Sequence, residues 1–230
     1  MALYRKGSIA TFASILLCLC GVSYAKTDEV VSSIHTDKKV IALTFDDGPN
    51  PVFTPKILDI LKQYNANATF FVLGKRVGMY PKLVIREVNE GHEIANHTFD
   101  HQYLKGSALQ RAEQEVVQTQ EAIYDTIEQV PHIFRPPGGI VNPSVINVAK
   151  QQHCQIVLWS WYQDTRDWKK PGVDKIVRTV LSNVHNGDIV LFHDFEGDCS
   201  QTVEALKIIL PELQKQGYQF LTVTDLLQTK

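Results

Sequence analysis

Asp46 and Asp47 follow directly on an apolar run at residues 40–45. Because side chains alternate between the two faces of a strand, neighbouring acids converge only if the chain bends between them. Gly48 and Pro49 come next and favour such a bend. Two acids at a strand end are costly unless a metal ion, a proton or another partner compensates their charge. This pair is therefore a candidate centre for chemistry.

His97 and His101 form the second candidate group. At this spacing on one helical turn, two side chains share a face and can bind one metal ion. A carboxylate from elsewhere would complete a site of two histidines and one acid, with positions left open for water and substrate. The spacing alone is weak evidence for a metal site, but the presence of Asp46 and Asp47 in the same chain strengthens this interpretation.

The elements that must position these residues alternate between apolar runs and helical patterns. This alternation predicts parallel strands joined by helices. The predicted strands span residues 40–44, 68–73, 92–96, 132–134, 155–160, 188–192 and 218–223. A capping box at Ser107 predicts the start of a long helix. The chain is short for eight complete units, so we expect an α/β fold, an irregular (β/α) barrel with about seven parallel strands.

Polar clusters follow five of the predicted strands. Active sites of parallel barrels lie at the C-terminal ends of the strands, so these positions are informative. The clusters are Asp46-Asp47, His97–His101, Arg135–Gly139, Asp164–Trp168 and His193-Asp194. Five clusters at five strand ends indicate an active site more strongly than any one of them.

The first 25 residues have the pattern of a secretory signal peptide. They contain basic residues, no acid, an apolar stretch at 9–22 and a small-x-small sequence ending at Ala25. The stretch is shorter than the roughly 20 apolar residues of a membrane span, although an uncleaved anchor is the alternative. We expect a signal peptide at 1–25, a loose polar lead-in at 26–37 and one domain at 38–230, in a secreted or periplasmic protein with no membrane contact after cleavage.

Charge and cysteine content narrow the possible partners. The chain has 23 basic and 25 acidic residues and no basic run, which argues against a nucleic-acid partner.

Cys18 and Cys20 lie in the expected signal peptide, which leaves Cys154 and Cys199. These precede the fifth and follow the sixth predicted strand, so a strand length of about 20 Å should separate them. A disulfide requires Cα atoms within about 7 Å, so we expect none.

The motifs and their order resemble those of polysaccharide deacetylases of the NodB-homology type, carbohydrate esterase family 4. That family carries Thr-Phe-Asp-Asp-Gly, His-Ser/Thr-x-x-His, Arg-x-Pro-x-Gly, Asp-x-x-Asp-Trp and Leu-x-His. This chain has the five motifs in that order at Thr44–Gly48, His97–His101, Arg135–Gly139, Asp164–Trp168 and Leu191–His193. The resemblance spans about residues 38–225, nearly all of the expected mature chain.

The resemblance implies roles for the first three motifs. Asp47, His97 and His101 would bind a divalent metal ion, usually Zn²⁺. Asp46 would be the general base, with Arg135 as the counter-charge that positions it.

It also implies roles for the last three motifs. A backbone N–H at Gly138 would stabilise the oxyanion, and His193 would act as general acid. Asp167 would orient His193, although Asp164 is an alternative for this role. Trp168 would form a wall of the substrate groove. The family often has an aromatic residue where this chain has Gly138. The resemblance therefore does not assign the substrate contact at this position.

The implied activity is hydrolysis of N-acetyl groups on an acetylated amino-sugar glycan, with release of acetate. Peptidoglycan, chitin oligomers and poly-N-acetylglucosamine are all admissible substrates. One alternative is an O-acetyl esterase acting on a polysaccharide such as xylan. Another is a non-catalytic carbohydrate-binding protein of the same fold. Acetate release with and without a chelator separates an enzyme from the non-catalytic binding protein.

Overall fold

The computed structural model describes residues 29–106 and 109–230. The expected signal peptide at 1–25, with Cys18 and Cys20, and the expected helix start at Ser107 lie outside the described residues. Within the described ranges, no helix combines the length and the apolar character that a bilayer span requires.

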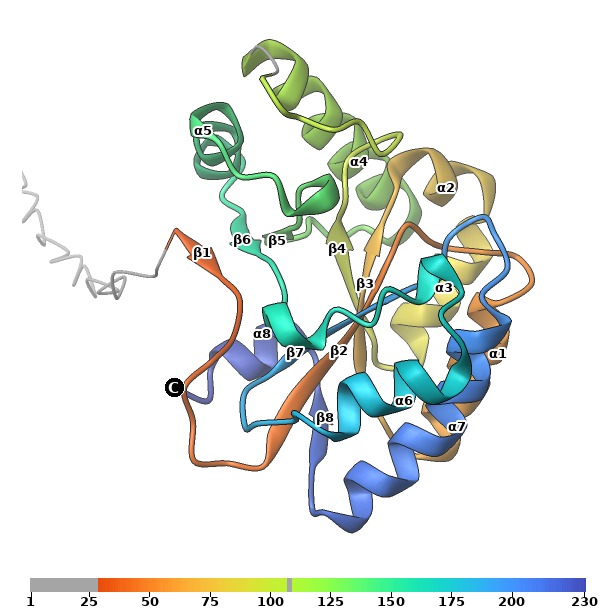
Figure 1. Ribbon diagram of the computed structural model, residues 1–230. Coiled ribbons are helices and arrows are strands. Elements are labelled where there is room, and N and C mark those ends of the chain that lie inside the picture. Colours follow the sequence, from red (N-terminus) through yellow and green to blue (C-terminus); the bar gives the residue numbers. More distant parts are fainter. Residues whose placement is uncertain (1–28, 107–108) are drawn as a thin grey trace, which may run out of the picture.

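Eight strands among the described residues form one sheet in which the paired strands are parallel (Figure 1). The strands are β1 (Val30–Val31), β2 (Val40–Asp46), β3 (Ala68–Val72), β4 (Glu93–Asn96), β5 (Ile133–Phe134), β6 (Gln155–Val157), β7 (Ile189–His193) and β8 (Gln219–Leu221). Their order is β1-β6-β5-β4-β3-β2-β7, and β8 pairs with β2. All seven predicted strands are present. The additional strand β1 lies in the lead-in that we expected to be loose, where it extends the sheet beside β6.

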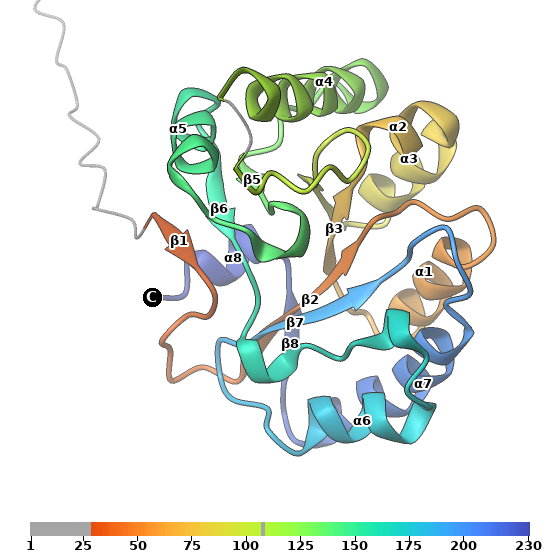
Figure 2. The ribbon, with the colours of Figure 1, turned by 45° about the horizontal axis from the view of Figure 1, so that its top comes forward.

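Helices surround the sheet, as Figure 2 shows. They are α1 (Thr54–Gln63), α2 (Gly74–Met79), α3 (Pro81–Asn89), α4 (Leu109–Ile127), α5 (Pro143–Gln151), α6 (Val173–Leu181), α7 (Ser200–Lys215) and α8 (Val223–Leu227). Short 3₁₀ turns occur at η1 (Pro137–Gly139), η2 (Trp161–Gln163) and η3 (Asp167–Lys169). The last predicted strand is shorter than expected, because Thr222 caps α8 by accepting a hydrogen bond from the Asp225 N–H at 3.2 Å.

The extended segment that follows β6 closes the sheet into a barrel. The Ser160 N–H donates to the Ile189 carbonyl at 3.0 Å, and Asp164 pairs with Leu191 in a parallel bridge. These contacts place the segment beside β7, at the far end of the strand order. The fold is therefore the irregular (β/α) barrel predicted from the sequence.

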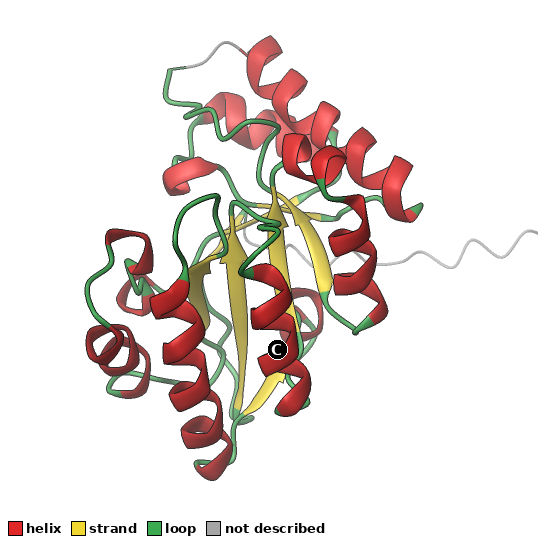
Figure 3. Ribbon diagram, turned by 90° about the vertical axis from the view of Figure 1, so that its right-hand side faces the viewer, coloured by secondary structure: helices red, strands yellow, loops and turns green. Residues whose placement is uncertain are grey.

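Strand β2 is buried along its whole length, and its residues pack into the apolar clusters on both sides of the sheet. Figure 3 shows helices lying against the sheet. The inner face of β2 starts with the apolar Val40 and Ala42, which pack with side chains of α8. The same face ends with Thr44 and Asp46, since side chains alternate along a strand. The barrel interior thus changes from apolar to polar toward the C-terminal ends of the strands.

The pairing register aligns two candidate residues. Strands β2 and β7 pair so that Asp46 lies beside His193, each as the last residue of its strand. Their side chains therefore leave the sheet at the same level.

Cys154 precedes β6 and Cys199 precedes α7, and both are free in the part of the chain that the structure describes, as predicted.

Candidate active site

Asp47, His97 and His101 form a cluster at the C-terminal end of the barrel. One ligand atom from each lies within 4.8 Å of the others. Asp47 Oδ1 is 3.3 Å from the Nε2 atoms of both histidines, and this buried oxygen has no hydrogen-bond donor among the described residues. Burial opposes ionisation of Asp47, but His97, His101 and His193 together lower its pKa to about 2. A buried carboxylate oxygen facing two imidazole nitrogens fits a divalent cation such as Zn²⁺.

The bend that exposes Asp47 lies at Asp47 itself. Its φ of 75° is left-handed, whereas we expected Gly48 and Pro49 to provide the bend. Gly48 is needed for space instead, because a Cβ there would lie 2.2 Å from both carboxylate oxygens of Asp194. Asp194 is fully buried and accepts a 2.5 Å hydrogen bond from Thr54 Oγ1, so it packs beneath the bend.

The prediction that His97 and His101 share a helical turn was wrong. Thr98 and His101 have left-handed φ angles of 73° and 64°, so this segment is an irregular loop. Its amides are bound by a side chain rather than by helical carbonyls. Glu115 on α4 accepts a hydrogen bond from the Phe99 N–H at 3.0 Å. The two histidines converge because this loop folds back over the end of β4.

The orientation of His97 leaves one ring nitrogen free to bind a metal ion. Its Nδ1 lies 2.7 Å from the Arg135 carbonyl, so Nδ1–H donates to that oxygen. The lone pair of Nε2 then points toward Asp47. Burial lowers the pKa of His97, but the charges of Asp46 and Asp47 outweigh it and raise that pKa overall. The site therefore favours a positive charge at Nε2.

Arg135 fixes Asp46 inside the barrel. Arg135 is fully buried, and its Nη1 donates to Asp46 Oδ1 at 2.6 Å. The same nitrogen donates to Thr44 Oγ1 at 2.9 Å, and the guanidinium lies 3.8 Å from the Phe71 ring centre. The remaining guanidinium nitrogens donate to the carbonyls of Val157 and Leu158 at 3.0 and 2.8 Å. Asp46 thus keeps one oxygen on a rigid cation, and its other oxygen lies 3.7 Å from His97 Nε2.

His193 is held by Asp167. His193 Nδ1 lies 2.7 Å from Asp167 Oδ1, and the His193 backbone N–H donates to Asp167 Oδ2 at 2.9 Å. Thr202 on α7 donates to the same oxygen at 2.7 Å. Asp164, the alternative, accepts instead from the backbone N–H of Arg166. Burial lowers the pKa of His193, but the hydrogen bond and charge of Asp167, with Asp46 and Asp47, raise it to about 9.

The clusters line one open hollow of about 360 Å³, which Gly138 and Trp168 also border. The five motifs therefore meet in one place. Aromatic side chains that the sequence analysis missed complete the lining: Tyr103, Trp159 and Phe195. Tyr103 and Phe195 each follow a motif histidine by two residues, which is the signal that could have found them.

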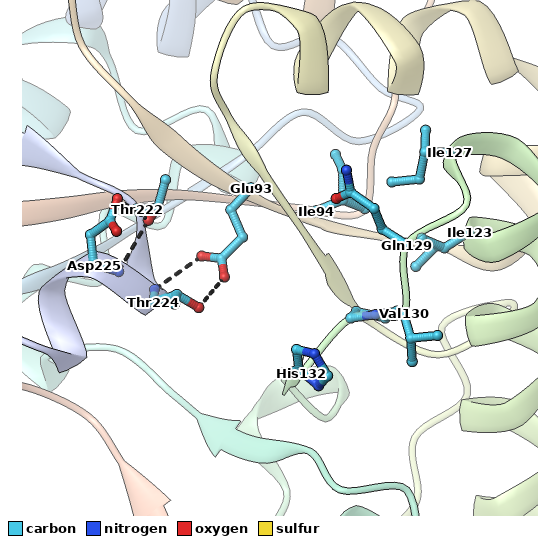
Figure 4. Close-up of a pocket in the computed structure, with 11 residues that line it drawn as sticks. Glu93, Ile94, Ile123, Ile127, Gln129, Val130, His132, Thr222, Thr224 and Asp225 are labelled. Carbon is cyan, nitrogen blue, oxygen red and sulfur yellow. Dashed lines mark hydrogen bonds between the residues drawn. The ribbon is translucent and has the colours of Figure 1, made fainter.

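The N-terminal end of β4 borders a different hollow, drawn in Figure 4. Glu93 accepts hydrogen bonds from the N–H and the hydroxyl of Thr224, and from Thr69 Oγ1 at 2.7 Å. His132 borders the same hollow and is exposed. Glu93 already has its hydrogen-bond donors, unlike Asp47 Oδ1.

Comparison with known proteins places this site in a family. The sequence profile described as polysaccharide deacetylase matches residues 33–157. A peptidoglycan-N-acetylglucosamine deacetylase of Bacillus cereus is 49% identical over 204 residues, covering 89% of this chain and 95% of that protein. A chitooligosaccharide deacetylase of Bradyrhizobium sp. is 41% identical over 191 residues, covering 78% of this chain and 86% of that protein.

A solved structure agrees with these sequence matches. The crystal structure of a peptidoglycan N-acetylglucosamine deacetylase in complex with 4-naphthalen-1-yl-N-oxidanyl-benzamide has a TM-score of 0.84 and 38% identity, covering 88% of this chain and 94% of that one. Fold and site together define a barrel hydrolase. The chain belongs to the polysaccharide deacetylase family, the NodB-homology group of carbohydrate esterase family 4, and it is an enzyme of the polysaccharide deacetylase type.

Proposed function

We propose that this polysaccharide deacetylase is a metal-dependent hydrolase that removes N-acetyl groups from an amino-sugar polymer or oligomer and releases acetate. The observation that carries the proposal is the buried Asp47 oxygen, which lies between two histidines and lacks a hydrogen-bond donor in the described part of the chain. Asp46 and His193 flank it as groups that can accept and donate protons.

Asp47, His97 and His101 would hold the metal ion, with Zn²⁺ as the first candidate because imidazole and carboxylate ligands suit it. When bound, the ion supplies a Lewis acid that polarises a carbonyl oxygen and makes a nearby water more acidic.

The remaining side chains would move protons and hold the substrate. Asp46, fixed by Arg135, would take a proton from the attacking water. The Gly138 N–H would donate to the carbonyl oxygen as negative charge develops there. His193, protonated beside Asp167, would give its proton to the departing amine. The carbon–nitrogen bond then breaks, which yields acetate and a free amino sugar.

The substrate class is supported by the relatives, whose names refer to peptidoglycan N-acetylglucosamine and to chitooligosaccharides. Both contain N-acetylated glucosamine, so we infer that an acetylated amino-sugar glycan is the partner of this chain. The signal-like segment at 1–25 supports action outside the cytoplasm, in a secreted or periplasmic location.

Acetate release from peptidoglycan and from N-acetylglucosamine oligomers tests the activity, with and without a chelator. We expect release that a chelator abolishes and added Zn²⁺ restores. Asp46→Asn should retain metal and lose turnover, whereas His101→Ala should lose metal as well. Equal metal content in these two variants would contradict the division between base and ligand.

Two outcomes would favour the alternatives. Faster release from acetylated xylan than from any amino-sugar substrate would identify an O-acetyl esterase. Glycan binding by metal-loaded protein without release of acetate would identify a carbohydrate-binding protein.

A further inference from the structure

Gly138 and Tyr103 compete for the same space beside the metal-ligand cluster. Gly138 is exposed at the border of the hollow, with a left-handed φ of 64°. A Cβ at this position would lie 2.8 Å from Cε1 of Tyr103, closer than side-chain atoms normally approach. The Tyr103 ring, which comes from the loop between β4 and α4, therefore lies where a side chain at position 138 would have to begin.

The backbone on both sides of Tyr103 is fixed. His101 precedes it by two residues, and the two rings meet edge to face with centres 5.3 Å apart. Leu104 follows it and is buried in the core, and the Leu104 carbonyl accepts a 2.7 Å hydrogen bond from Asn142 Nδ2. Asn142 is itself fixed because it caps α5 by accepting from the Val145 N–H. These contacts restrain Tyr103 from both sides in the absence of a ligand.

Despite these attachments the Tyr103 side chain is 62% exposed and faces the hollow shared by Asp47 and His193. An aromatic ring held in place but open to solvent presents an apolar face at little cost in conformational entropy. A pyranose ring offers a matching apolar face of C–H groups and a rim of hydroxyl groups. The Tyr103 hydroxyl has no hydrogen-bond partner among the described residues, so it is available to that rim.

We propose that Tyr103 is a sugar-binding wall of the site, in addition to the wall expected at Trp168, and that position 138 is glycine because the ring needs its space. Tyr103 would hold the acetylated sugar so that its acetamido group lies over Asp47. This inference rests on the proposed deacetylase function and adds to it the residue that positions the substrate.

The first test measures binding without turnover. In the metal-loaded Asp46→Asn background, calorimetry would give the Kd for an N-acetylglucosamine tetramer. We expect Tyr103→Ala to raise this Kd by about threefold to tenfold, the range of one aromatic contact. Tyr103→Phe should retain most of the affinity. Tyr124→Ala is the matched control, because Tyr124 is 51% exposed on α4 and is not among the described residues that line the hollow.

The second test uses turnover in the otherwise unaltered protein. Tyr103→Ala should raise KM with little change in kcat, metal content or thermal midpoint. An unchanged Kd and KM in this variant would overturn the proposal. Absence of acetate release by the unaltered protein would instead overturn the proposed function, since the calorimetric test does not depend on turnover.

A double-mutant cycle tests the shared space. Gly138→Ala should lower kcat/KM, because the new methyl group displaces the Tyr103 ring and the left-handed backbone is strained. In the Tyr103→Ala background the same change should cost less, since only the strain remains. Equal losses in both backgrounds would show that the two positions do not interact and would contradict the proposal.

Discussion

The two ends of β4 each carry a buried histidine, and the two histidines have opposite tendencies to bind a proton. His92 precedes the strand, and burial lowers its pKa to about 4, while its Nδ1 accepts a hydrogen bond from the Ala68 N–H. His97 follows the strand, and Asp46 and Asp47 raise its pKa despite complete burial. Burial is similar at the two ends, so the neighbouring carboxylates make the difference.

The acids at the two ends differ in the same way. Glu93, at the N-terminal end, already accepts hydrogen bonds from two threonines. Asp47, at the C-terminal end of the barrel, has a buried oxygen without a donor in the described ranges. The carboxylate of Glu93 at the N-terminal end is thus satisfied as folded, whereas the carboxylate of Asp47 at the C-terminal end still needs a positive charge. The difference separates residues that stabilise the fold from residues that we propose bind the metal ion and react.

The largest expected effect comes from replacing the histidine at one end of β4 and comparing it with a replacement at the other end. His97→Ala should abolish metal binding and lower activity by more than the roughly 10- to 100-fold that loss of an outer partner of a ligand costs. His92→Gln should leave metal content and activity of the folded protein unchanged. Metal analysis and acetate release on both variants check this. A His92→Gln protein that folds but lacks metal would break the comparison.

The next largest effect concerns His193, the proposed proton donor. Asp167→Asn should lower kcat by about 100-fold, because His193 loses its orientation and its charge partner. The pKa of His193 stands near 9, so activity that needs its protonated form should persist up to that pH and fall above it. Loss of the Asp167 charge lowers this pKa, so the alkaline limb of the pH–rate profile should move to lower pH by about one unit. An unmoved limb would argue against His193 as the acid.

A smaller effect is expected in the pH dependence of stability. The pKa of His92 is about 4 in the folded protein, below its ordinary value of 6.5, so the unfolded chain binds the proton first. The contribution of neutral His92 is complete above pH 6.5 and is lost as the pH falls from 6.5 toward 4, by about 3 kcal/mol in total. Denaturant titrations of metal-saturated protein would measure it as the difference between the unaltered protein and His92→Gln. His132→Gln, at an exposed histidine, is the control for loss of an imidazole side chain.

The smallest effect is expected at Glu93. Glu93→Ala leaves the hydroxyl and N–H of Thr224 without their acceptor, which should lower the free energy of unfolding by about 2 kcal/mol. Activity per folded molecule should not change. Glu113→Ala, at an exposed position on α4, is the control for loss of one acidic charge. A loss of acetate release that exceeds the loss of folded protein would contradict the assignment of Glu93 to structure alone.

The sequence contained enough to predict the strands and the residues that end them. Apolar runs of strand length are local signals, and polar side chains directly after them, such as Asp46 and His193, need only the barrel rule to be brought together. The backbone between His97 and His101 was not predictable, because no local pattern marks its left-handed residues and its contacts include Glu115 on α4. Thr202 was missed for a related reason. It is one polar residue on a helix of ordinary composition, and only the tertiary structure brings α7 to Asp167 in η3.

The contact between Tyr103 and Gly138 shows a further limit. Thirty-five positions separate the two residues in the chain, and nothing local to either predicts the meeting. Strand β1 was missed because two residues are too few for a periodic pattern, and its pairing with β6 creates it. Local patterns thus predicted the residues that the barrel strands hold in place. The contacts between loops became known only from the structure.

The pairing of Asp46 with His193 has a consequence for how such an enzyme can change over time. Residues paired across parallel strands stand about 4.8 Å apart, whatever loops follow them. The distance between the backbone positions that carry the proposed base and the proposed acid is therefore inherited from the sheet. The loop that carries Tyr103 can then be replaced by another without disturbing that distance. New substrates become accessible through loop exchange alone, so specificity can diversify while the reaction itself is conserved.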